Sequence, residues 1–301
     1  MTERLSEITA RIEGIRQLGA VVNAMRGIAG ARAQQARGAL AAVGTYVATL
    51  AFAISHTLAL MPEAEGGQIT HRKGGRILVL FAAEQGFVGA YGERLFDAAK
   101  ADFADVELFL VGTRGAMLAA ERGITPRWTG PLPSRPAGVP RFADHLAEAL
   151  YTRIAGGGID RLEVIFGGWR AERGLAVERR LLFPLNRATF PRPVISYPPL
   201  FDLPLTTLLD QLTADYIHAE LCDVALHAFA AENQARMEAM ASAHLEIERK
   251  LAALRSRQHV VRQEEITAEI IELAAGGTSG RPSLFDGAII GVSQIPPDSG
   301  L

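Results

Sequence analysis

The 301-residue sequence predicts an α/β fold in which two long terminal helices form an antiparallel coiled coil with an inserted three-layer, mainly parallel sheet. Two proline-free stretches, 3–60 and 205–275, repeat apolar residues at steps of three or four, as amphipathic helices do. Between them, short apolar runs alternate with helical stretches, which is typical of a parallel sheet. The chain thus divides into an N-terminal coiled-coil helix (1–60), an α/β, Rossmann-like domain (61–204), a C-terminal coiled-coil helix (205–277) and a flexible tail (278–301).

The N-terminal helix is predicted from one continuous apolar stripe. Leu5, Ile8 and Ile12 begin this stripe and Ile54 ends it, with an average step near 3.5 residues that indicates a left-handed supercoil with a partner helix. The most apolar stretch, 43–61, contains six polar side chains between its apolar ones, so we interpret it as a packed helix and not as a membrane span. The charged start of the chain lacks the apolar core of a signal peptide, and we expect a cytoplasmic protein.

The middle region is predicted as strands separated by helices. We expect strands at 76–82, 107–112 and 161–167, a fourth strand that pairs antiparallel at 175–185, helices at 92–103, 113–123 and 142–155, and a proline-rich connection at 126–140. Helices of this length between strands favour parallel pairing.

The C-terminal helix has a less regular stripe, so we expect stutters in its pairing. Pro204 suits its start and Gly276 its end. It carries six basic and twelve acidic residues over 205–275, whereas the N-terminal helix carries six Arg and three Glu over 3–60. Opposite charge favours their pairing, although each surface ion pair adds little.

Composition and motifs argue against several functions. A net charge of −2 argues against nucleic-acid binding, and a single Cys excludes a disulfide framework. The loop 84–92 has the spacing Gly-x-x-Gly-x-x-Gly, which is neither a dinucleotide fingerprint nor a P-loop, so we favour tight packing over phosphate binding. The seven His residues include no i, i+4 pair, and Cys222 reads as a small buried thiol. We expect no catalytic residue, no cofactor and no metal.

Three motifs resemble the gamma subunit of F-type ATP synthases. The first is Arg-Ile at 11–12 followed by Ala-Met-Arg at 24–26. Residues 232–240 resemble the family's Ala-Arg-Met-x-Ala-Met block, and 262–272 resemble its Arg-Gln-x-x-Ile-Thr-x-Glu signature. The segment 77–89 is a looser match to the family's first strand and Gly-rich turn.

The resemblance, which extends over 3–277, implies a central rotor shaft that couples ion flow through a membrane ring to ATP synthesis or hydrolysis by rotation. Such a subunit is not itself an enzyme. Its implied partners are the alpha and beta subunits of the catalytic hexamer, the epsilon subunit and the membrane c-ring, on the cytoplasmic side of the bacterial inner membrane. The positions it implies for subunit contact and coupling are Met25, Arg26, Arg236, Met237, Met240, Arg262, Gln263, Thr267 and Glu269.

Some residues depart from the family pattern. Val21, Val22 and Asn23 stand where the family usually has Ile-Thr-Lys, and Gly27 follows the Met-Arg pair, which indicates a divergent branch of a main or an alternative F-type complex. The residues alone leave two alternatives open: a non-motor coiled-coil adaptor with an α/β head, and an α/β nucleotide-binding enzyme with helical arms. The resemblance implies that the tail emerges at the crown of the catalytic ring or folds into its throat.

Overall fold

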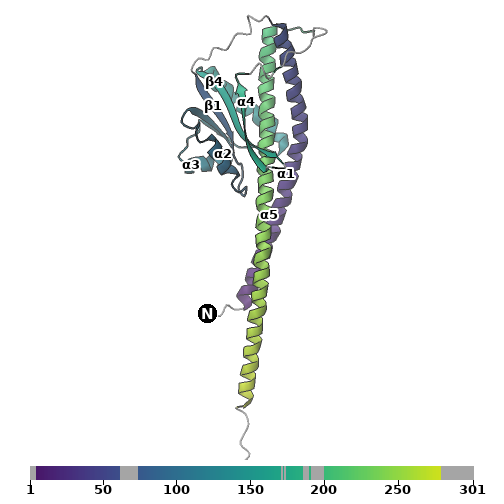
Figure 1. Cartoon of the computed structure of the whole chain (residues 1–301), viewed down its shortest axis with the longest axis vertical. Coiled ribbons are helices and arrows are strands. Elements are labelled where there is room, and N and C mark those ends of the chain that lie inside the picture. The colour runs from purple at the N-terminus through teal and green to yellow at the C-terminus, as the bar shows by residue number, and fades with distance from the viewer. Residues whose placement is uncertain are drawn as a thin grey trace, which may run out of the picture. The chain divides into compact units, whose positions relative to one another are not determined.

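The computed structural model describes residues 5–61, 74–170, 172, 174–185, 190 and 200–278. Along the chain, the long helix α1 (Leu5–Leu60) precedes an α/β region and the long helix α5 (Leu205–Thr278) follows it (Figure 1). The chain divides into two compact units, one formed by its two ends up to Gln17 and from Glu248, the other by Leu18–Ile247. The predicted tail lies outside the described residues beyond Thr278, and the predicted domain limits stay predictions.

Within the Leu18–Ile247 unit, α1 and α5 pack closely and run antiparallel. A Cβ atom placed on Gly19 would lie 3.2 Å from the Ile247 side chain, and one on Gly30 would lie 3.3 Å from the Met237 sulfur. Contacts that advance along α1 while they recede along α5 define an antiparallel pair. The predicted pairing of the terminal helices is therefore confirmed, with glycine at two points of close approach.

The helix α1 is long and apolar enough in one window to span a membrane, a property that core helices of soluble proteins share. Several of its side chains are instead buried within the chain. Ala36 joins a core cluster with Leu221 of α5, while Leu50 and Ile54 pack with Tyr216. This packing accounts for part of its apolar stripe.

A five-stranded sheet forms the centre of the larger unit. Its strands are β1 (Gly75–Phe81), β2 (Val106–Val111), β3 (Trp128–Gly130), β4 (Ile159–Arg170) and β5 (Gly174–Phe183), in the order β3-β2-β1-β4-β5. Only β5 is antiparallel to its neighbour, as the sequence predicts. The short β3 was not predicted, because three residues inside a proline-rich connection carry no periodic signal.

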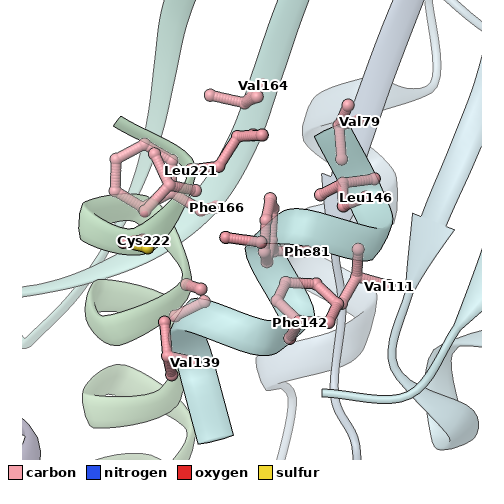
Figure 2. Close-up of a cluster of buried hydrophobic side chains, with 14 of the residues drawn as sticks. Val79, Phe81, Val111, Val139, Phe142, Leu146, Val164, Phe166, Leu221 and Cys222 are labelled. Atoms are coloured by element: carbon pink, nitrogen blue, oxygen red, sulfur yellow. The ribbon is translucent and has the colours of Figure 1, made fainter. Parts of the chain in front are cut away.

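Helices cover both faces of the sheet, which confirms three layers. They are α2 (Tyr91–Ala99), α3 (Thr113–Glu121) and α4 (Val139–Ala155). Alternate side chains of β1 point to opposite faces, so Leu78 and Leu80 pack with α2 while Val79 and Phe81 pack with α4 and α5. Figure 2 shows the core on the face of Val79 and Phe81, in which Phe142 of α4 and Leu221 of α5 pack against the sheet.

Candidate functional site

The strand order of the sheet reverses between β1 and β4. Neighbours of β1 lie on opposite sides, with β2 on one and β4 on the other. In doubly wound sheets the carboxyl ends of the strands at such a point commonly hold the ligand. Here the loop that leaves β1 at this point, residues 84–89, is bound by two side chains of α5, Glu232 and Arg236.

Glu232 binds the N–H groups of this loop. One carboxylate oxygen accepts the N–H of Glu84 at 2.8 Å and the other accepts the N–H of Gln85 at 3.1 Å. Two consecutive amides that point to one carboxylate make the arrangement by which loops bind anions. The loop therefore has an anion site whose occupant comes from the same chain.

Arg236 binds the carbonyl groups of the same loop. Its Nε donates to the carbonyl of Gly86 at 3.1 Å, and one terminal nitrogen donates to the carbonyl of Gln85 at 3.2 Å. The other terminal nitrogen donates to the Asn233 side chain at 3.1 Å. The planar guanidinium suits this divergent set of acceptors, which a lysine could not serve together.

The two side chains also bind each other. A terminal nitrogen of Arg236 lies 2.6 Å from a carboxylate oxygen of Glu232, and the side chains are 6% and 4% exposed. Burial raises the pKa of Glu232, while Arg236 and the two loop amides oppose that rise by stabilising its charge. Burial likewise raises the pKa of the neighbouring Tyr91, whose hydroxyl donates to the Ala228 carbonyl at 3.3 Å.

The loop then presents an aromatic side chain to solvent. Phe87 has a backbone φ of 61°, a region that bulky residues rarely occupy, and its side chain is largely exposed. It lies at a groove of about 340 Å³ that Met25, Ile28, Arg32 and Arg236 also line. The groove therefore joins α1, the loop and α5 in one surface.

The predicted contact residues on the larger unit are unevenly accessible. Met25, Arg26 and Met237 are half-buried, and Arg26 donates to the Asn23 side chain at 2.9 Å. Met240 is buried, and so is Arg236. Of these five residues, only Met25 and Arg236 line the groove.

The remaining predicted residues lie on α5 in the unit formed by the chain ends. Arg262, Gln263, Thr267 and Glu269 are all exposed, and the Thr267 hydroxyl donates to the Gln263 carbonyl one turn earlier at 2.8 Å. They lie within two turns of one helix, so a single partner surface can reach several of them.

Sequence reasoning assigned no role to Glu232, although it lies inside the quoted motif. A signal was present, because Glu232 and Arg236 form an i, i+4 pair directly after the apolar run 228–231. A charge pair that interrupts a buried helix face indicates partners inside the protein. Among the described residues, no group of three or more His, Cys, Asp or Glu side chains is arranged to hold a metal.

Known proteins resemble this chain over nearly all of its length. The ATP synthase family matches residues 4–279. The ATP synthase gamma chain of Streptomyces avermitilis is 26% identical, over 93% of this chain and 97% of its own length. The ATP synthase gamma chain of Geobacter sp. (strain M21) is 22% identical, over 91% and 98%.

Solved structures share the fold. A chain of the Euglena gracilis mitochondrial ATP synthase, solved as OSCP/F1/c-ring in rotational state 3, superposes with a TM-score of 0.67 at 16% identity, over 91% of this chain and 94% of its own. A chain of the Tetrahymena thermophila mitochondrial ATP synthase, solved as central stalk and c-ring, gives a TM-score of 0.52 at 16% identity, over 74% and 99%.

Proposed function

The chain belongs to the ATP synthase gamma chain family, and from that membership we propose the contacts through which it transmits rotation. It is the central-stalk rotor subunit of an ATP synthase and is not itself catalytic. The observation that carries this conclusion is the family match over 4–279, which includes both terminal helices and the whole α/β region. A match to the α/β region alone would have left the adaptor and enzyme alternatives open.

We propose that Arg262, Gln263, Thr267 and Glu269 form one contact surface for the catalytic subunits. Their exposure supports this, because side chains that meet a partner must be free of the chain's own core. The fork of Arg262 can pair with a carboxylate in a defined geometry, which suits a contact that changes with rotational state. The partner elements that the family implies are an acidic loop and a catch loop.

We propose a second contact surface at the groove beside the loop 84–89. Met25 lines this groove, and Arg26, the next residue of α1, is half-buried. The burial of Arg236 and Met240 supports roles within the chain, where Arg236 holds the loop. Met237, which faces Gly30, acts in the same way.

The proposed partners are the alpha and beta subunits, the epsilon subunit and the membrane c-ring. The Euglena gracilis structure, solved with F1 and the c-ring, and the Tetrahymena thermophila structure, solved as central stalk and c-ring, support the F1 and c-ring partners. We place the protein peripherally at the membrane, and the bacterial relatives support the cytoplasmic side of a bacterial inner membrane.

The test is charge reversal at Arg262 in the assembled complex. ATP hydrolysis and ATP-driven ion pumping are measured with Arg262→Glu, and with Arg255→Glu as a control that reverses an exposed arginine elsewhere on the same helix. We expect the Arg262 variant to lower coupled activity about tenfold, within the range of measured coupling energies, and the control to stay near wild type. Equal behaviour of the two variants would reject the contact.

A further inference from the structure

We propose that the loop after β1 contains a carboxylate-binding cradle and that Glu232 is its built-in ligand, which fixes the position of Phe87. The cradle consists of the N–H groups of Glu84 and Gln85 and the guanidinium of Arg236. Its occupant reaches it from 148 and 147 residues away along the chain.

The hydrogen bonds support a ligand site more than ordinary helix packing. Both oxygens of Glu232 are used on separate amides, and Arg236 closes the site at 2.6 Å. Arg236 also holds the carbonyls of Gln85 and Gly86, so the peptide is bound along both edges. Because both side chains are nearly fully buried, water does not compete for these bonds.

The cradle lies at the start of a glycine-rich turn. Glycine-rich turns after the first strand of α/β sheets can bind phosphate through backbone N–H groups. In this chain the Glu232 carboxylate accepts the N–H groups of Glu84 and Gln85, the two residues directly before the first glycine of the turn. These two amides therefore already have an anionic partner from the same chain.

The hold of Glu232 and Arg236 on the loop has a consequence for Phe87. A bulky residue in the left-handed region is strained, so the surrounding bonds must hold it there. The bonds to Glu84, Gln85 and Gly86 fix the three residues directly before Phe87. Glu232 and Arg236 are therefore positioning residues for an exposed ring at the groove, a step that rests on the proposed function of that groove.

The cradle is tested by removing its ligand and supplying the missing atoms. Glu232→Ala deletes a fragment equal to acetate and leaves the Cβ atom in place. Hydrogen exchange of the Glu84 and Gln85 amides is measured in the assembled complex. We expect exchange about tenfold or more faster in the variant, and slowed again by acetate in a saturable manner.

Matched controls distinguish binding of acetate in the cradle from effects of ionic strength, of an uncharged molecule of the same shape and of substitution elsewhere on α5. Acetamide has the same shape without charge, and chloride matches ionic strength, so neither is expected to restore protection. Glu238→Ala changes an exposed glutamate on the same helix and is expected to leave loop exchange at the wild-type rate. Acetate that fails to slow exchange in Glu232→Ala would overturn the cradle.

A second variant covers failure of Glu232→Ala to assemble. Arg236→Lys keeps the charge but cannot reach both loop carbonyls, so we expect faster exchange at 84–86 without a response to acetate, since Glu232 still fills the site. If the amides at 84–86 exchange at the wild-type rate in this variant, Arg236 does not hold the loop.

The positioning role has its own readout, the ratio of ions pumped to ATP hydrolysed. Glu232→Ala and Phe87→Ala are each expected to lower this ratio roughly threefold or more, with no further loss when they are combined. Full coupling in Phe87→Ala, alongside uncoupling in Arg262→Glu, would reject the positioning role and leave the proposed function standing.

Discussion

Arg180 on β5 donates a hydrogen bond to Asp223 on α5 across 2.9 Å, and this contact joins the outer strand of the sheet to the long helix. The same nitrogen also contacts Glu220, and the guanidinium lies over the Phe166 ring with 5.2 Å between its carbon and the ring centroid. Both carboxylates are largely buried. In a rotor subunit, torque on α5 must reach the sheet, and this contact holds β5 against the helix.

Arg180→Met is therefore expected to destabilise the chain. The change leaves two buried carboxylates without their cation, and we expect the free energy of unfolding to fall by about 2–4 kcal/mol. Urea unfolding of the full-length chain measures it. Arg170→Met is the control, because Arg170 pairs with Glu178 at the exposed end of the same strand pair and should cost about 0.5 kcal/mol or less. Equal losses of unfolding free energy in the two variants would contradict a role for Arg180 in holding β5 against α5.

Two glycine substitutions are expected to act in opposite directions. In α1, a Cβ on Gly27 would meet nothing within 4 Å, so Gly27→Ala should raise the free energy of unfolding by about 0.5–1 kcal/mol through helix propensity. In α3, a Cβ on Gly115 would lie 2.3 Å from the Cβ of Ala82, so Gly115→Ala should lower it by about 2 kcal/mol. Thermal unfolding of both variants checks the signs, and a stabilising Gly115→Ala would refute the close approach.

The thiol of Cys222 is expected to be inert in the native chain. Burial, with smaller contributions from Asp144 and Asp223, raises its pKa to about 11, so roughly one molecule in ten thousand carries the thiolate at pH 7. Iodoacetamide should label the chain rapidly in urea and very slowly without it, as mass spectrometry can measure. Rapid labelling under native conditions would show that the site opens.

Acid should weaken the ion-pair network in which Arg76 and Arg179 bind Asp102 and Glu163. The hydrogen bond from Arg179 holds the pKa of Asp102 below its ordinary value of 3.8, against the effect of burial. A lowered pKa in the folded chain stabilises it above pH 3.8, and that contribution is lost as the pH falls through the lowered pKa. We expect Asp102→Asn to flatten the fall in unfolding free energy below about pH 4.

Urea titrations at a series of pH values measure this dependence. Asp105→Asn serves as the control, because Asp105 is an exposed carboxylate in the same turn region after α2. It should retain the wild-type pH dependence. A wild-type slope in Asp102→Asn would instead assign the acid sensitivity to other carboxylates.

Local pattern was sufficient for most elements of the fold. The stripe that begins at Leu5 predicted α1 almost to its observed end at Leu60, and Pro204 marked the start of α5 at Leu205. Both signals are local, since periodicity and proline act over a few neighbouring residues. The sequence also predicted the antiparallel β5, because only three residues separate it from β4 along the chain.

The direction in which a motif side chain points was not within reach of local pattern. Arg236 was assigned to contacts between subunits, a role that stays a prediction, and the fold turns its guanidinium inward onto Gln85 and Gly86. The residue pattern of such a helix motif is the same whether its arginine faces solvent or a loop that is distant in the sequence.

By itself, the sequence determined the two helices, the strand and helix alternation between them, and the family through motifs spread over its length. Only the tertiary structure decided that Glu232 binds the loop after β1 and that Phe87 lines the same groove as Met25. The physical reason is distance along the chain. Hydrophobic periodicity is set by neighbours within a turn or two, whereas these contacts join residues well over a hundred positions apart, and only packing of the whole unit selects them.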